Sequence, residues 1–253
     1  LTIHSGNIGT AQGGTSANGT GGSGIRSGDT LTISNSATIT NATGGTSANG
    51  TGGSGIYSNR ELKIDGSAAI TNATGGASTD GTGGYGIRSG SMLTISDNAA
   101  ITKATGGSGR SGGHGLFGSV MKIISGTIGT AQGGEGKISG GNGIYGVGKL
   151  TISDNAAITN ATGGNATSID GTGGSGIYSD GKLTIEKSTI TNATGGTSTN
   201  GTGGSGIRGD GSSNDFKLSI DSATITNATG GDGKRGGSGL FGKTMEIISS
   251  AIK

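Results

Sequence analysis

The strongest constraint in this chain is an internal repeat of about 31 residues. A repeat of this length is one structural unit that buries its apolar face only against a neighbouring copy. One anchor of the repeat is Gly-Ser-Gly-Ile and its variants, whose aliphatic residue returns after 31, 31, 29, 28, 33, 30 and 33 residues. These aliphatic positions are Ile25, Ile56, Ile87, Leu116, Ile144, Ile177, Ile207 and Leu240. The near-constant step predicts about eight stacked coils.

Two more apolar segments recur in every coil. The first is Leu-x-Ile or Met-x-Ile, which begins at Leu1, Leu31, Leu62, Leu93, Met121, Leu150, Leu183, Leu218 and Met245. The second is centred on Ile39, Ile70, Ile101, Ile128, Ile158, Ile190 and Ile225, and it usually continues as Thr-Asn-Ala-Thr-Gly-Gly. Each segment alternates apolar and polar residues with a period of two, which is typical of a strand.

This alternation predicts which side chains face the interior. In the first full coil we expect Leu31, Ile33 and Ile39 to point inward, and Thr32, Ser34, Thr38 and Thr40 to point outward. Three short strands per coil, repeated in register, form parallel sheets, and parallel crossovers are almost always right-handed. The predicted fold is therefore all-β: a right-handed parallel β-solenoid, or β-helix, with about eight coils.

Composition agrees with this prediction. Only 28% of the residues are hydrophobic, which is little for one compact core, whereas a solenoid needs only a few aliphatic side chains per coil. Glycine supplies 62 of 253 residues, and between the strands we interpret Gly, Asn, Asp and Ser as turn residues.

Composition also limits the partners that we expect. The chain has no Cys, which excludes disulfides and thiolate metal sites, and a net charge of +2, which does not indicate a nucleic acid. No apolar run approaches the roughly 20 residues that span a bilayer. We therefore expect no cofactor, no metal and no membrane span in this segment.

A longer period groups the coils in fours. Residues 1–14 return at 121–134, and 245–249 begins a third copy. We therefore divide one continuous solenoid into super-repeats 1–120 and 121–244 and the start of a third at 245–253. Neither end carries a recognisable cap, so we expect the coils to continue in a longer parent protein or to stack end to end with another copy.

Two of the repeated runs resemble a known group of proteins. Gly-Ser-Gly-Ile-Tyr-Ser-Asp-Gly-Lys-Leu-Thr-Ile at 174–185 and Ile-Thr-Asn-Ala-Thr-Gly-Gly at 190–196 are similar to glycine-rich β-solenoid repeats of large bacterial cell-surface and adhesin-like proteins. The resemblance covers essentially the whole chain and is one of repeat style, with no fixed functional residues to carry over. It implies an extracellular location, a fibrous or adhesive role and, in some members, carbohydrate binding.

The residue after the Gly-Ser-Gly-Ile aliphatic forms the most informative outward column. It is occupied by Arg26, Tyr57, Arg88, Phe117, Tyr145, Tyr178, Arg208 and Phe241. Stacked Arg and aromatic side chains make cation–π and aromatic contacts. One interpretation is a binding stripe for sugar rings or a neighbouring fibre, widened by Tyr85 and His114. The other is a ladder that only stabilises the stack.

Threonine forms a second column around the buried Ile of the third strand. A regular Thr-x-Thr array would indicate ice binding, but Ala69, Ala100 and Ala157 interrupt one half of it and Gly129 the other. The strand propensity of Thr explains the same pattern.

Asparagine has two interpretations as well. The residues that open an Asn-x-Ser/Thr sequon, and are candidate N-glycosylation sites, are Asn18, Asn41, Asn49, Asn72, Asn160, Asn165, Asn192, Asn200 and Asn227. Five of them instead fit a ladder of stacked amides: Asn41, Asn72, Asn160, Asn192 and Asn227. The exchange of Asn-Gly-Thr for Asp-Gly-Thr at Asp80 and Asp170 keeps a turn residue and loses the glycan acceptor, which favours turn chemistry at these positions.

Signals for catalysis are weak. The 15 acidic residues are scattered, and we place Asp65, Glu186 and Asp221 in one column but several coils apart. His4 and His114 have no repeated partner, and Asp97-Asn98 and Asp154-Asn155 fit turns. We expect no enzyme, although the fold also occurs in polysaccharide-active enzymes.

Together these observations favour an extracellular structural segment: a stalk, filament or adhesin shaft. We expect self-association, end to end or laterally, and weak multivalent contacts with glycans or fibres through the Arg and aromatic column. An ice-binding solenoid and a polysaccharide-active β-helix enzyme are the alternatives.

Overall fold

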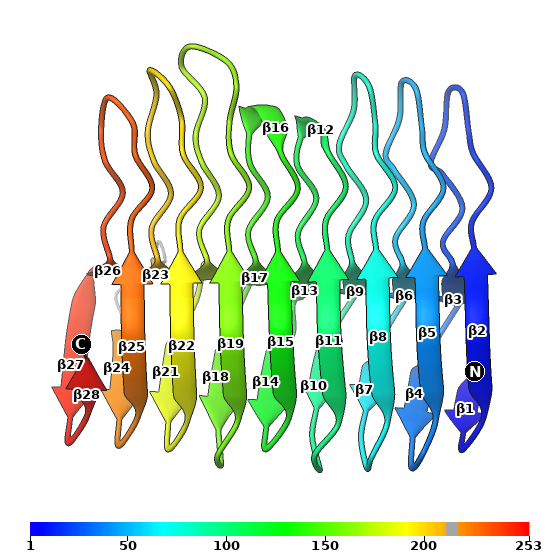
Figure 1. Ribbon diagram of the computed structural model, residues 1–253, viewed down its shortest axis with the longest axis horizontal. Coiled ribbons are helices and arrows are strands. Elements are labelled where there is room, and N and C mark those ends of the chain that lie inside the picture. The colour runs from blue at the N-terminus through cyan, green and yellow to red at the C-terminus, as the bar shows by residue number, and fades with distance from the viewer. Residues whose placement is uncertain (211–216, 253) are drawn as a thin grey trace.

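The computed structural model describes residues 1–210 and 217–252, and every regular element among them is a β-strand. The strands form stacked coils, and three long parallel sheets run the length of the molecule (Figure 1). The predicted parallel β-solenoid with three strands per coil is therefore confirmed. None of the described residues forms a helix that is long and apolar enough to cross a membrane.

The Leu-x-Ile segments form the first sheet, which we call the leucine sheet. Its strands are β1 (Thr2–His4), β4 (Leu31–Ser34), β7 (Leu62–Ile64), β10 (Met92–Ile95), β14 (Val120–Ile124), β18 (Leu150–Ser153), β21 (Leu183–Glu186), β24 (Lys217–Asp221) and β27 (Thr244–Ile248).

The Ile-Thr-Asn-Ala-Thr segments form the second sheet, the threonine–asparagine sheet. Its strands are β2 (Asn7–Gln12), β5 (Thr38–Thr43), β8 (Ala69–Thr74), β11 (Ala100–Thr105), β15 (Thr127–Gln132), β19 (Ala157–Thr162), β22 (Thr189–Thr194), β25 (Thr224–Thr229) and β28 (Ala251–Ile252).

The strands that follow Gly-Ser-Gly form the third sheet, the ladder sheet. It consists of β3 (Ile25–Ser27), β6 (Ile56–Ser58), β9 (Ile87–Ser89), β13 (Leu116–Gly118), β17 (Ile144–Gly146), β20 (Ile177–Ser179), β23 (Ile207–Gly209) and β26 (Leu240–Gly242). A small extra sheet pairs β12 (Gly109–Ser111) with β16 (Gly136–Ser139).

The coils keep one register from the first strands to the last. Leu31 pairs with Leu62 and Leu62 with Leu93, and the pairing from β10 to β14 crosses the boundary between residues 120 and 121 without a break. In Figure 1 the threonine–asparagine strands run upward in front, the leucine strands run downward behind them, and the chain advances from right to left, which is a right-handed coil. At the usual spacing of parallel strands, eight coils rise roughly 38 Å.

The core is a set of aliphatic columns. Leu31, Ile33 and Ile39 are completely buried, and so are their equivalents in the following coils up to Leu218, Ile220 and Ile225, whereas those of the last strands, Met245, Ile247 and Ile252, are exposed. Ala42 and its equivalents in β8 to β22 form a further buried column, where the coil is too narrow for more than a methyl group. Each column is continuous because identical side chains lie one strand spacing apart, so each coil buries apolar area on two neighbours.

The prediction that the side chain of Ser34 points outward was wrong. Thr38 and Thr40 are exposed and Thr32 is half-buried, but Ser34 is only 8% exposed. The strand ends at Ser34, and the chain turns sharply at Asn35, whose φ is 57°, so that the amide of Ala37 donates to the carbonyl of Ser34 over 3.2 Å. The turn thus covers a side chain that the period-two pattern places outside.

The pairs Asp97-Asn98 and Asp154-Asn155 occupy the corresponding turn in other coils. All four residues have positive φ angles, between 55° and 66°. Asn and Asp tolerate the left-handed region better than other non-glycine residues, which confirms these two pairs as turn residues.

Between the threonine–asparagine strand and the ladder strand, each coil extends into a narrow loop that we call the glycine lobe, for example residues 44–55. The two walls of a lobe are in backbone contact. A Cβ atom at Gly44 would lie 1.9 Å from the carbonyl oxygen of Gly53 on the opposite wall, and one at Gly45 would lie 1.9 Å from that of Gly14 in the preceding coil.

The lobe walls are joined by a hydrogen-bond zipper that runs along the molecule. The amide of Gly53 donates to Gly45 of the same coil over 2.8 Å, and Gly45 donates to Gly22 of the preceding coil over 2.7 Å. Gly76 of the next coil then donates to Gly53 over 2.8 Å, and the alternation continues to Gly237. The zipper satisfies backbone groups that a buried loop would otherwise leave unpaired.

The interpretation of the glycines as turn residues was therefore wrong for most of them. Among the described glycines only Gly66, with a φ of 63°, adopts the left-handed conformation. Most of the glycines in the lobes are required because a side chain would collide with nearby backbone, not because of their φ angles.

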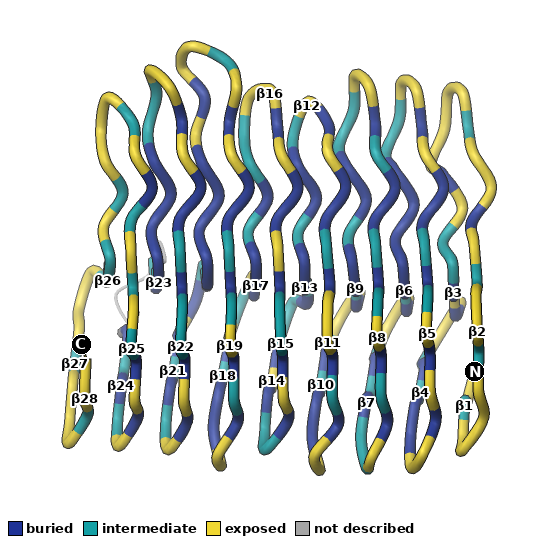
Figure 2. The backbone as a smooth tube through the Cα atoms, in the orientation of Figure 1, coloured by how far each residue is buried: buried dark blue, intermediate teal, exposed yellow. Residues whose placement is uncertain are grey.

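In several lobes, a buried serine forms hydrogen bonds at the tip of the lobe. Ser47 is 4% exposed, and its Oγ donates to the carbonyl of Gly19 in the preceding coil over 2.7 Å and accepts from the amide of Gly50 over 2.9 Å. Ser78 and Ser198 repeat the arrangement. In the inner coils the part of the lobe next to the sheets is buried, whereas the tips of the lobes and the turns at the opposite end of the coils are mostly exposed (Figure 2). Much of the variation in coil length falls at these tips.

Candidate functional site

The predicted binding stripe forms one continuous column on the outer face of the ladder sheet. All eight residues are half-buried or exposed, and the strand register pairs each with the next. We call this column the ladder; it consists of Arg26, Tyr57, Arg88, Phe117, Tyr145, Tyr178, Arg208 and Phe241.

The first half of the ladder is dominated by cation–π contacts. The guanidinium carbons of Arg26 and Arg88 lie 5.5 Å and 5.0 Å from the ring centroid of Tyr57, one from the preceding coil and one from the following coil. Arg88 also lies 5.0 Å from the Tyr85 ring and 5.7 Å from the Phe117 ring. Tyr57 is thus held between two guanidinium groups, and Arg88 lies among three aromatic rings.

The middle of the ladder is a cluster of aromatic rings. Phe117 and Tyr145 meet edge to face at 5.6 Å, and Tyr145 and Tyr178 are stacked at 5.2 Å with an interplanar angle of 8°. His114 joins them from the adjacent lobe, 4.7 Å from Tyr145 and 5.4 Å from Tyr85. These distances lie within the range where aromatic pairs attract one another.

In the last part of the ladder, two carboxylates contact the column. Arg208 lies over Tyr178 at 5.1 Å and over Phe241 at 5.2 Å, and its guanidinium forms an ion pair with Asp210. The hydroxyl of Tyr145 donates a hydrogen bond to Asp180. Sequence reasoning did not assign a role to either carboxylate, although both follow their ladder strand by one residue.

Because the side chains stack along the axis, the ring faces in the ladder are taken up by neighbouring coils. Each such contact is worth about 0.5–1.5 kcal/mol in general, so the column stabilises the stack. What it presents to a ligand is ring edges, tyrosine hydroxyls and guanidinium groups rather than open aromatic faces.

The two stacked tyrosines stay protonated at neutral pH. Burial raises the pKa of both Tyr145 and Tyr178 well above the ordinary value, and the carboxylate of Asp180 raises it further. Their hydroxyls are therefore hydrogen-bond donors over the whole physiological range.

His114 is held in its neutral form. Burial among the aromatic rings lowers its pKa from 6.5 to about 3, and its Nδ1 accepts a hydrogen bond from the amide of Asn142 over 2.8 Å. The acceptor role of Nδ1 places the proton on Nε2. His114 is thus an apolar and hydrogen-bonding part of the ladder rather than a charged group.

We expect the protein to lose stability on mild acidification because of His114. The unfolded chain binds a proton at this residue below about pH 6.5 and the folded chain does not until about pH 3, so the free energy of unfolding falls as the pH falls through this window. Denaturant melts at pH 7, 6 and 5 measure the slope. His114→Gln, which keeps an acceptor for Asn142, is expected to flatten it; an unchanged slope in this variant would assign the effect to other groups.

The candidate sequon residues fall into two structural groups. In the threonine–asparagine sheet the amides form ladder hydrogen bonds, from Asn72 to Asn41 over 3.1 Å, from Asn192 to Asn160 over 2.9 Å and from Asn227 to Asn192 over 2.8 Å. Successive amides in this column lie about one strand spacing apart, which leaves no room for glycans on adjacent coils.

The second group lies in the glycine lobes and is exposed: Asn18, Asn49, Asn165 and Asn200. Asn49 donates to Asn18 over 2.8 Å, and the Asn165 side chain accepts from the amide of Thr197 over 2.8 Å. If glycosylation occurs, these positions have the space for it, and the hypothesis stays open.

The threonine column lies on the outer face of the threonine–asparagine sheet. Thr40, Thr71 and Thr102 are exposed in successive coils, but Gly129 follows them and the exposed Lys103 replaces an Asn beside them. The array of hydroxyl and methyl groups is therefore interrupted at its centre.

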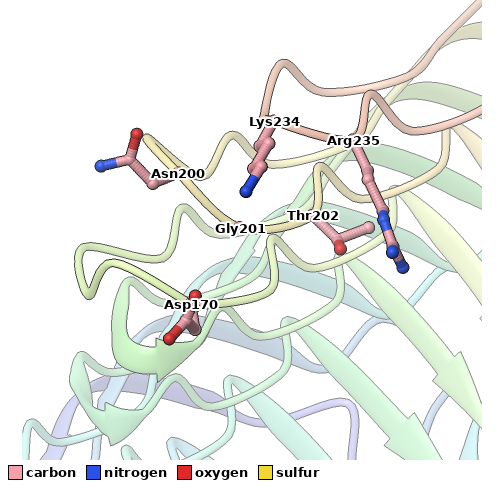
Figure 3. Close-up of a pocket in the computed structure, with 6 residues that line it drawn as sticks. All are labelled: Asp170, Asn200, Gly201, Thr202, Lys234 and Arg235. Carbon is pink, nitrogen blue, oxygen red and sulfur yellow. The ribbon is translucent and has the colours of Figure 1, made fainter.

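A shallow depression of about 240 Å³ lies over the last glycine lobes (Figure 3). Lys234 points into it above Gly201, Arg235 extends along its other side past Thr202, and Asp170 approaches from a neighbouring coil. Both basic residues are exposed. The depression combines hydroxyl, amide and charged groups without an enclosed wall, so it defines no particular ligand.

One placement of acidic residues was wrong. Glu186 and Asp221 do not lie several coils apart: they are register partners in the neighbouring strands β21 and β24. Lys187 lies 3.5 Å from Glu186, and Ser222 donates to Asp221 over 2.9 Å. Asp65, the third member of the column, forms an ion pair of 2.5 Å with Lys63 instead. Glu186 and Asp221 each directly follow a Leu-x-Ile segment, and the two segments, which begin at Leu183 and Leu218, are consecutive copies.

Residues 1–210 and 217–252 contain no group of three or more His, Asp or Glu side chains arranged to hold a metal ion.

The fold and the ladder together define a repeat protein of the parallel β-solenoid class. No model of a known protein family matches the chain, and no curated protein matches it.

Proposed function

We propose that this chain is a structural segment of an extracellular or cell-surface protein, acting as a rigid shaft in a stalk, filament or adhesin. The observation that carries the proposal is the unbroken parallel register of the leucine and threonine–asparagine sheets through all the described coils. A solenoid of this kind behaves as a rod whose length is set by the number of coils.

The interior supports a mechanical role. Columns of Ile and Leu fill the space between the sheets, the glycine zipper closes the lobes, and the ladder ties the coils together on the outside. Each of these features acts between neighbouring coils, so every added coil contributes the same contacts. The proposal also includes lateral or end-to-end association of chains and weak multivalent contacts with glycans or fibres.

Catalysis is not part of the proposal. Glu186 and Asp221, the acidic residues that the register brings together, are engaged by Lys187 and Ser222. Ice binding is not favoured either, because Lys103 and Gly129 interrupt the threonine array.

Immunoelectron microscopy of unfixed source cells tests the proposal. With antibodies raised against residues 1–253, we expect label on the cell surface or on filaments that extend from it. Intact cells treated with protease are expected to lose the label, whereas a periplasmic or cytosolic marker stays intact. Label confined to the cytosol, or label that protease leaves unchanged until the cells are lysed, would contradict the extracellular role.

A further inference from the structure

The first three coils of the ladder form one wall of a groove. A cavity of about 320 Å³ lies between the ladder and the adjoining glycine lobes, and Arg26, Tyr57 and Arg88 line it on the ladder side. This volume is at the lower end of the range typical of ligand sites. Arg26 is exposed and Arg88 half-buried, so both guanidinium groups belong to the surface of the groove.

The opposite wall is made of hydroxyl and peptide groups. Thr20, Ser23, Thr51 and Ser54 line it together with Gly22, which is exposed, and Gly21 and Gly52, which are buried. Hydroxyl and amide groups of this kind match the hydroxyls of a sugar in hydrogen-bonding capacity, since each offers both donors and acceptors.

The two arginines that line the groove have no counter-charge among the described residues. Among the described residues neither Arg26 nor Arg88 forms an ion pair, whereas Arg208, in the same column, pairs with Asp210. The Nε atom of Arg88 is buried and has no hydrogen-bond partner. A buried donor without a partner costs free energy.

The position of the charges suggests a linear ligand. Arg26 and Arg88 lie two coils apart, which is roughly 10 Å at the usual strand spacing. The ring of Tyr57 between them is covered by both guanidiniums, so stacking of a nucleobase or a neutral sugar on its face is excluded. Contacts with a ligand in this groove therefore depend on charge and hydrogen bonds.

We propose that this groove binds an acidic saccharide, with Arg26 and Arg88 contacting its carboxylate or sulfate groups and the hydroxyl wall contacting the sugar. The planar guanidinium matches the geometry of both kinds of anion. The inference deepens the glycan contacts of the proposed function by naming the ligand class. Its failure would leave the role as a structural shaft untouched.

Isothermal titration calorimetry on the purified chain at low salt tests the inference. The probes are tetragalacturonate, a sulfated tetrasaccharide, a neutral galactose tetramer and inorganic phosphate. We expect at least one acidic oligosaccharide to bind at least tenfold more tightly than the neutral tetramer, with an affinity that falls as salt is added. Whether the carboxylated or the sulfated probe binds more tightly identifies the anion.

Matched variants locate the site. Arg26→Gln with Arg88→Gln is expected to weaken binding at least tenfold, and Arg208→Gln, whose arginine already has a partner, less than twofold. Arg26→Lys with Arg88→Lys keeps the charge and is expected to retain part of the affinity, with circular dichroism and melting curves verifying that all variants fold. Equal binding of acidic and neutral tetramers, phosphate binding as tight as that of the best oligosaccharide, or full affinity in the double Gln variant would each overturn the proposal.

Discussion

Replacing Gly84 by alanine is expected to destabilise the protein by about 3 kcal/mol or more. The new Cβ would lie 1.9 Å from the carbonyl oxygen of Gly53 and 2.8 Å from that of Gly52. These are backbone atoms of the preceding coil, so no side chain can rotate away, and the two neighbouring lobes must separate.

Separation would also stretch the zipper. The amide of Gly84 donates to Gly76 on the opposite wall of the lobe over 2.7 Å, and its carbonyl accepts from Gly107 of the following coil over 2.8 Å, so the damage reaches both of these contacts. Equilibrium denaturation of the variant and the parent chain measures the loss.

Gly28→Ala is the matched control for Gly84→Ala. No heavy atom lies within 4 Å of a Cβ atom built at Gly28, and its φ is not in the left-handed region, so this change is expected to alter stability by less than about 0.5 kcal/mol. If both variants lose the same small amount, the lobes are wider than the structure shows, and the explanation of the glycine content would be wrong.

Truncating a central core residue is expected to have the second-largest effect. Ile128 is completely buried in β15, between Ile101 of one neighbouring coil and Ile158 of the other. Ile128→Ala should cost about 2–5 kcal/mol, because it removes apolar contacts on both sides and leaves a cavity that the rigid coils cannot close. Since a solenoid transmits stability from coil to coil, we also expect unfolding to begin near this position.

Native-state hydrogen exchange measured by mass spectrometry checks both parts of this prediction. Peptides from β11, β15 and β19 should lose protection before peptides from β5 or β22 do. Ile138→Ala is the control, since Ile138 is 44% exposed and lies in the lobe strand β16. A uniform loss of protection over the whole chain would indicate that the coils unfold as a single unit and that the central position is not special.

Much of the architecture was predictable from the sequence because a solenoid repeats its contacts. Once the step from Ile25 to Ile56 is recognised, the parallel register places Tyr57 beside Arg26 and Asn72 beside Asn41 without further information. The columns of core residues, the three strands per coil and the ladder follow from the same step.

Other features were not predictable because they depend on how separate parts of a coil approach one another. The sequence shows Gly-Gly pairs but not that the two walls of a lobe meet, so the turn interpretation looked sufficient. The burial of Ser34 depends on the turn at Asn35.

Some properties of the ladder were predictable from the sequence and others were not. Its eight members could be read from the sequence, because equal spacing in a repeat becomes adjacency in a stack. The sequence did not show which of these arginines have a counter-charge. Asp210 and Arg208 meet only through the local path of the chain, whereas Arg26 and Arg88 face a groove.

The sequence by itself determined the class of fold, the core columns and the order of side chains along the ladder, since these depend only on the period and the alternation of residues. The tertiary structure alone decided the backbone contact inside the glycine lobes and the cationic groove beside the first coils. These depend on distances between chain segments that lie far apart within a coil, and no local pattern encodes such distances.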